Sequence, residues 1–124
     1  AKNLPHLIEA DQALLHQAVY NLVENAIKYT PENGFIRLHA HATETEIFFD
    51  IEDSGIGISE EAKKRLFEKF FRSSQRAARA QQGTGLGLAI VRSIAERHGG
   101  RVWVESEEGK GSVFHLKVPI HQSK

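Results

Sequence analysis

The residues best suited to chemistry are the three alternating glycines of Gly83-Thr84-Gly85-Leu86-Gly87-Leu88, which precede an apolar-periodic segment at 89–98. Glycine lets the backbone approach a ligand without interference from a Cβ atom and reaches positive φ at little steric cost. The helix predicted to follow directs its unpaired N–H groups and positive dipole end toward this loop, which suits a polyphosphate. A plain glycine-rich turn has the same pattern, and the string matches neither the P-loop nor the dinucleotide fingerprint.

Two further groups of residues have types and spacings that fit a binding site. Asn21, Asn25 and Lys28 are spaced i, i+4, i+7, which places them in one polar stripe along a predicted helix. Asp53 ends a predicted strand at another glycine-spaced turn, Asp53-Ser54-Gly55-Ile56-Gly57-Ile58. A carboxylate there can accept a hydrogen bond from an exocyclic amine, or it can simply initiate an Asx turn. Taken alone, the two asparagines are more often exposed polar groups of a helix.

Composition limits the class of protein. The 124 residues correspond to one domain, and 40% hydrophobic with 26% charged residues is ordinary for a globular protein. The 16 basic residues balance the 16 acidic ones, so no net field attracts nucleic acid or an anionic membrane. The absence of cysteine excludes disulfides and thiolate metal sites. No apolar run approaches the roughly 20 residues of a membrane span, and the lack of methionine suggests a fragment of a longer chain.

The predicted helices and strands define an α+β fold. Asp11 is a suitable N-cap for a long amphipathic helix, which Thr30-Pro31-Glu32-Asn33-Gly34 ends, and Ser59 is a suitable N-cap for a short one. In chain order, we predict an edge strand at 4–9, the long helix, strands at 35–41 and 47–53, a short helix at about 60–67, a helix at 89–98 and strands at 101–106 and 112–119. This order implies a two-layer α/β sandwich, with a mixed sheet of about five strands covered on one face by about three helices.

Residues 72–84 interrupt this regular pattern. They contain no large apolar side chain that could attach the segment to a core. A long connection of this kind between ordered elements is commonly an active-site lid, although a solvated helix or a plain surface loop has the same composition.

The histidines give weaker signals. His39 and His41 point to the same face of one predicted strand, but without a third ligand a solvated face is favoured over a metal site. His98 precedes Gly99-Gly100 at the end of a helix, where a hydrogen-bonding cap is the simplest role.

Four motifs together resemble those of a known family. Residues 21–29, 53–58, 67–72 and 83–88 resemble, in order and at about the right spacing, the N box, first glycine box, F box and second glycine box of sensor histidine kinases. The resemblance is to their ATP-binding catalytic domain and covers essentially the whole chain. It implies the Bergerat fold shared with gyrase, MutL and the large heat-shock chaperones, a single domain at 1–124, a lid at about 68–87, and ATP with Mg²⁺ as cofactors.

The resemblance also implies roles for individual residues. Asp53 hydrogen-bonds the adenine amino group, and Asn25 is the Mg²⁺ ligand. Lys28 and Arg72 meet phosphate oxygens. The other residues implied at the nucleotide are Asn21, Tyr29, Gly55, Gly57, Ile58, Phe67, Gly83, Thr84, Gly85, Leu86, Gly87 and Leu88. Ile58 and Leu88 could supply apolar walls, and Phe67, with Phe70 and Phe71, would attach the lid to the core. As a bare apolar cluster, simple packing is the favoured role for at least two of these phenylalanines.

One difference from related ATP-hydrolysing families bears on the type of reaction. Related families that hydrolyse ATP carry a glutamate one helical turn before the metal-binding asparagine, where this chain has Asn21, which cannot accept a proton. Glu24 is next to Asn25 in sequence but turned about 100° away around the helix. We therefore expect γ-phosphoryl transfer to an external acceptor, with Asn21, Lys28 and Arg72 as the catalytic residues that position the phosphates and neutralise their charge.

The expected acceptor is not among the seven histidines of this chain, since none lies in a two-helix phosphoacceptor pair. The resemblance implies a histidine on a separate dimerisation domain and a response regulator as partners, with no nucleic acid and no direct membrane contact. It also implies a cytoplasmic domain that is monomeric alone, in a parent that is homodimeric and membrane-anchored. The alternatives are a non-catalytic ATP-binding regulatory module, a serine-directed anti-sigma-type kinase and an ATP-hydrolysing switch, the last disfavoured by Asn21.

Overall fold

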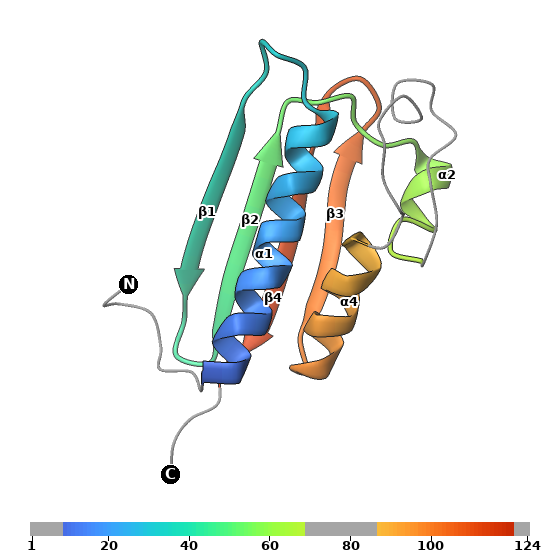
Figure 1. The fold of residues 1–124 in the computed structure, drawn as a ribbon. Coiled ribbons are helices and arrows are strands. Elements are labelled where there is room, and N and C mark those ends of the chain that lie inside the picture. The colour runs from blue at the N-terminus through green and yellow to red at the C-terminus, as the bar shows by residue number, and fades with distance from the viewer. Residues whose placement is uncertain (1–8, 69–86, 121–124) are drawn as a thin grey trace.

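The computed structural model of the chain describes residues 9–68 and 87–120. Its elements are α1 (Glu9–Tyr29), β1 (Ile36–Ala42), β2 (Glu46–Asp53), α2 (Glu60–Lys63), α4 (Gly87–Arg97), β3 (Arg101–Glu107) and β4 (Gly111–Pro119). The strands form one sheet in the order β1-β2-β4-β3. Helices α1 and α4 lie side by side on the same face of this sheet (Figure 1).

The predicted α+β sandwich of two layers is confirmed. All three strand pairs of the described sheet are antiparallel, so none of them supplies the parallel pair that a mixed sheet requires. The expected edge strand at 4–9 lies outside the described residues except for Glu9, which is helical.

Helix α1 supplies most of the helical layer. It begins at Glu9, so Asp11 lies inside the helix and is not its N-cap, because Glu9 and Ala10 are good helix formers and extend the first turn. The helix ends at Tyr29, as predicted, and the hydroxyl of Thr30 donates to the carbonyl of Ala26 at 2.7 Å. None of the described helices has the length and the apolar content needed to cross a membrane.

The core lies between this helical layer and the inner face of the sheet. Alternate residues of β2 and β4 point inward and are buried, as expected for a sheet covered on one face. Small residues on the two helices allow them to approach closely. The main buried cluster comprises Ala18, Leu22, Ala26, Ile51, Val91, Ile94, Ala95, Phe114 and Leu116.

The ends of α2 and α4 lie close to the positions predicted from the sequence. The predicted cap of α2 is confirmed, because the Ser59 hydroxyl accepts from the Ala62 amide at 3.1 Å, although the helix stops at Lys63 and turns follow it. Helix α4 begins two residues earlier than predicted. His98 is buried and its Nδ1–H donates to the Ile94 carbonyl at 2.7 Å, which confirms its role as a helix cap.

Two leucines provide a matched test of the core. Leu22 is completely buried and Leu38 on β1 is 53% exposed. We expect Leu22→Ala to lower the free energy of unfolding by about 2–5 kcal/mol, because it removes buried methyl groups and leaves a cavity. Leu38→Ala should change it by less than about 0.5 kcal/mol. Urea denaturation monitored by circular dichroism measures both, and equal losses in the two variants would contradict the assigned core.

Candidate functional site

The C-terminal end of α1 packs against the Asp53–Ile58 turn. The Ile56 amide donates to the Tyr29 carbonyl at 3.2 Å, and a Cβ atom on Gly55 would overlap the same carbonyl oxygen. The last turn of the helix, the end of β2 and the β3–β4 turn all lie at one end of the sheet (Figure 1). The structure therefore brings the first two predicted motifs together.

Asp53 is the buried charged group of this region, with 6% of its surface exposed. Its Oδ1 accepts from the Gly55 amide at 2.8 Å, so the Asx-turn interpretation of this residue is confirmed. Burial raises the pKa of the Asp53 carboxyl, hydrogen bonds from the Gly55 and Ser112 main chains oppose that rise, and the nearby Glu52 adds to it. The result is a carboxylate acceptor held in a fixed direction within a poorly solvated turn.

The β3–β4 hairpin lies directly behind this turn, a contact that the sequence did not predict. The Gly109 amide donates to the Ile56 carbonyl at 2.7 Å. Gly57 has φ of 72°, and a Cβ atom there would overlap the Glu107 carbonyl oxygen. Glycine is thus required at position 57 by both conformation and space. The glycines at 109 and 111, which also have positive φ, were the available signal that this hairpin turn has a special shape.

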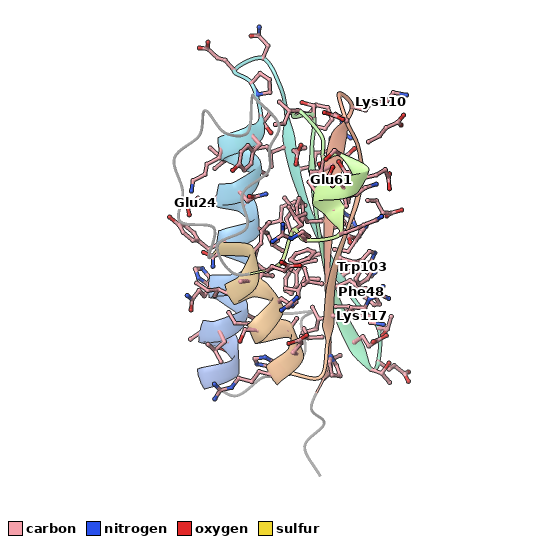
Figure 2. All side chains as sticks on the ribbon, turned by 90° about the vertical axis from the view of Figure 1, so that its right-hand side faces the viewer. Glu24, Phe48, Glu61, Trp103, Lys110 and Lys117 are labelled. Carbon is pink, nitrogen blue, oxygen red and sulfur yellow. The ribbon has the colours of Figure 1, made fainter. Side chains whose placement is uncertain are left out.

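The polar stripe of α1 has the geometry that its spacing predicted. Asn21 and Asn25 are half-buried on one side of the helix, and Lys28 is exposed near its end. Glu24 projects from the side of α1 that faces away from the sheet (Figure 2), and it accepts a hydrogen bond from the Tyr20 hydroxyl at 3.4 Å. The carboxylate nearest to Asn25 in sequence therefore points away from the core.

The apolar residues predicted at the site are half-buried and contact the core. Ile58 and Leu88 both pack against the main buried cluster. The Phe67 ring meets the Phe114 ring edge to face, with centroids 6.3 Å apart. Packing on the core is thus confirmed for Phe67, the first phenylalanine of the F box.

Several predicted residues lie outside the described part of the chain. They are Phe70, Phe71, Arg72, Gly83, Thr84, Gly85 and Leu86. The predicted lid at 68–87 is described only at its two ends. Glu68 pairs with Arg65 at 3.1 Å, and Gly87 is the first residue of α4, where a Cβ atom would meet nothing within 4 Å.

The face of the sheet away from the helices carries a separate polar surface. Phe48, Trp103 and Lys117 project from it (Figure 2). His41 stacks on Phe48 with ring centroids 4.7 Å apart, and the rings of His39 and His41 are 5.9 Å apart. Within residues 9–68 and 87–120, no three histidine, aspartate or glutamate side chains are grouped so that they could hold a metal ion. A neighbouring salt bridge joins Arg37 to Glu52 at 3.4 Å, so these two opposite charges are partnered with each other.

The buried carboxylate predicts a pH-dependent gain in stability for Asp53→Asn. A carboxyl with a raised pKa in the folded state stabilises the fold fully below its unfolded pKa and loses that contribution as the pH rises through its folded pKa. Ionisation of Asp53 as the pH rises therefore lowers the stability of the domain, because the charge is buried. We expect Asp53→Asn to unfold at higher urea concentration than the wild type at pH 7, with the difference shrinking toward pH 4.

Glu96→Gln on the exposed side of α4 is the matched control and should show no such trend, since Glu96 is 4.0 Å from Arg92 on the helix surface. If Asp53→Asn is less stable than the wild type at pH 7, the hydrogen bonds from Gly55 and Ser112 outweigh the cost of burial.

Comparison with known proteins agrees with this geometry. The model of a family described as histidine kinase-, DNA gyrase B- and HSP90-like ATPases matches residues 10–122. The adaptive-response sensory kinase SasA of Synechococcus sp. (strain CC9311) is 47% identical over 116 residues, which are 93% of this chain and 30% of that protein. The chain spans 30% or less of the length of the first sensory kinases that it matches.

Two solved structures have the same fold. The mycobacterial sensor histidine kinase MprB has a TM-score of 0.76 and 33% identity, over 86% of this chain and 72% of that one. Full-length ShkA in complex with AMPPNP has a TM-score of 0.76 and 34% identity, over 89% of this chain and 22% of that one. The resemblance that the four motifs indicated is thereby confirmed. The chain belongs to the histidine kinase-, DNA gyrase B- and HSP90-like ATPase family, and within it to the catalytic domains of sensor histidine kinases.

Proposed function

We propose that residues 1–124 bind Mg·ATP and transfer its γ-phosphoryl group to a histidine on a separate dimerisation domain. In this reaction the bond between the γ-phosphorus and the β–γ bridging oxygen breaks, ADP leaves with the electron pair, and an imidazole nitrogen forms the new bond to phosphorus. The observation that carries the proposal is the packing of the last turn of α1 onto a glycine turn that holds a buried carboxylate, Asp53.

Adenine would be recognised at the Asp53 turn. A carboxylate can accept a hydrogen bond from the exocyclic amine of adenine, whereas guanine places a carbonyl oxygen at the same position. Because Gly55 and Gly57 carry no side chains, the base can lie close to the main chain. The cost of burying the charge of Asp53 is partly offset when a ligand donates to it, which couples nucleotide binding to the stability of the turn.

The phosphates would lie between the polar stripe of α1 and the start of α4. Asn25 can offer a neutral amide oxygen to Mg²⁺, which in sites of this kind keeps several water and phosphate ligands and neutralises phosphate charge. Lys28 would meet phosphate oxygens from the end of α1, and Arg72 would do so from the lid at 68–87. Helix α4 has no acidic residue in its first turn, so its positive end is open to an anion.

Transfer is favoured over hydrolysis because neither Asn21 nor Glu24 can supply a general base to the site. Asn21 cannot act as a general base, and Glu24 faces away from the sheet. Two relatives support the wider assignment: SasA is named a sensory kinase, and the ShkA structure contains the ATP analogue AMPPNP. We infer that the acceptor histidine belongs to another part of the parent protein and that a response regulator receives the phosphoryl group from it. We further infer that the domain is cytoplasmic, in a parent that is homodimeric and membrane-anchored.

ATP affinity tests the role of Asp53. We expect Asp53→Asn to weaken ATP binding by about 1–3 kcal/mol, because it removes a charge-assisted hydrogen bond to the adenine amine. In the wild type, affinity should fall as the pH is lowered through the raised pKa of this carboxyl, since protonation removes the charge. Isothermal titration calorimetry measures both effects. Glu96→Gln should bind ATP as the wild type does, and unchanged affinity in Asp53→Asn would refute the proposed site.

Phosphoryl transfer requires an acceptor. Mixing the domain with labelled ATP and the dimerisation domain of its parent should give an acid-labile phosphohistidine on the latter. No label would favour the regulatory module, and an acid-stable phosphoserine on a partner would favour the serine-directed kinase.

The metal dependence of binding tests Asn25. We expect the wild type to bind ATP more tightly with Mg²⁺ than with a chelator, and Asn25→Ala to lose this difference because it removes the amide ligand. Calorimetry under both conditions provides the measurement. Gln17→Ala, at an exposed position of α1, is the control and should retain the difference. Equal wild-type affinity with and without the metal would contradict this role.

A further inference from the structure

We propose that Ser106 on β3 is a positioning residue of the nucleotide site, and that its hydroxyl holds the Asp53–Ile58 turn in the shape that distinguishes adenine from guanine. This inference rests on the proposed function, in which that turn binds the base. Ser106 is 48 residues from Ile58 along the chain, so the contact between them is entirely a product of the fold.

The Ser106 hydroxyl uses all of its hydrogen-bonding capacity. It donates to the Gly111 carbonyl at 2.9 Å and accepts from the Ile58 amide at 2.9 Å. The Ser112 hydroxyl is 2.8 Å away. Because a serine hydroxyl has one proton and two lone pairs, and Gly111 takes the proton, Ser112 must be the donor in this third contact. One oxygen atom thus joins the end of the turn to the first two residues of β4.

These contacts surround Asp53. The turn that begins at Asp53 ends at Ile58, which donates to Ser106. On the other side, the main chain of Ser112 donates to the Asp53 carboxylate, and its buried side chain donates to Ser106. The direction of the carboxylate relative to the rest of the turn is therefore set by Ser106 indirectly, through Ile58 and Ser112.

The same residue is also tied to the segment that leads to Phe67. The Lys63 ammonium donates to the Ser106 carbonyl at 2.8 Å and pairs with Glu60 at 2.7 Å. This contact uses the main chain of Ser106 and would survive removal of the hydroxyl. A change at the Ser106 side chain should consequently loosen the turn without releasing α2.

Removing the hydroxyl would leave the half-buried Ile58 amide without its acceptor. An unsatisfied amide is costly, so the turn would shift to reach water. The Gly55 bond to Asp53 would remain, and so would a carboxylate able to bind an amine. Its orientation would be less fixed, so we expect the preference for the adenine amine over the guanine carbonyl to decrease.

The test compares Ser106→Ala with Ser93→Ala, an exposed serine on α4. Dissociation constants for ATP and GTP are measured by competition with a fluorescent ATP analogue, and exchange of the Ile58 amide is followed by NMR without nucleotide. We expect Ser106→Ala to raise the dissociation constant for ATP roughly tenfold, as for the loss of one buried hydrogen bond, and to raise that for GTP less. The exchange of the Ile58 amide hydrogen should become faster. Ser93→Ala should match the wild type.

An unchanged preference for ATP over GTP in Ser106→Ala would overturn the inference, whether both affinities stay the same or fall equally. An equal fall would indicate a general structural role. If Ser106→Ala does not fold, Ser112→Ala removes the neighbouring donor, and the ratio of its dissociation constants for GTP and ATP provides the same test. Asp53→Asn separates the two proposals. If that variant binds ATP normally, the proposed site and this inference both fail; if it binds weakly while Ser106→Ala keeps its preference, only the inference fails.

Discussion

The candidate site depends on main chains that pass one another too closely to leave room for side chains. A Cβ atom on Gly55 would overlap the carbonyl oxygen of Tyr29, one on Gly57 would overlap that of Glu107, and one on Gly111 would overlap that of Asp53. These three contacts join α1, the Asp53–Ile58 turn and the β3–β4 hairpin at a single end of the sheet. The glycines therefore determine how three elements assemble, in addition to giving a ligand access to the backbone.

Within this framework, a charged group is retained where burial opposes its charge. Asp53 is surrounded by main-chain donors from Gly55 and Ser112, and burial still raises its pKa. The raised pKa means that burial favours the neutral form of this side chain. Functional sites often retain groups that reduce the stability of the free protein, because those groups are satisfied only when a ligand is present. Asp53 fits this pattern, whereas on the opposite sheet face Arg37 pairs with Glu52 and His115 pairs with Asp50.

The sequence predicted most of the elements because their signals are local. Helical spacing identified the buried face of α1, alternation identified β4, and the residue types at Ser59 and His98 identified two helix ends. The start of α1 was predicted too late, because Glu9 and Ala10 are good helix formers and extend the helix beyond Asp11, the predicted N-cap. Helix boundaries are the least certain part of such a prediction.

The site was only partly predictable, for a different reason. Asp53 and its glycines could be identified from their types and order, since these are properties of one short segment. Ser106 could not, because it acts through a contact with Ile58 that is far away in sequence. Periodicity shows which side of a strand faces the core, but not which turn lies against which hairpin. The two glycines with positive φ at 109 and 111 indicated a constrained turn without naming its neighbour.

The strand order has a consequence for how the domain forms during synthesis. Among the strands that the structure describes, β4 is translated last, yet it lies between β2 and β3, which do not pair with each other. A nascent chain that has emerged only as far as β3 can form the β1–β2 hairpin, but it lacks β4, the strand with which β3 pairs in the described sheet. The carboxylate turn likewise lacks Gly111 and Ser112 until that moment. Assembly of the candidate site is therefore tied to the synthesis of β4, so a nascent chain that ends before β4 would lack part of this site.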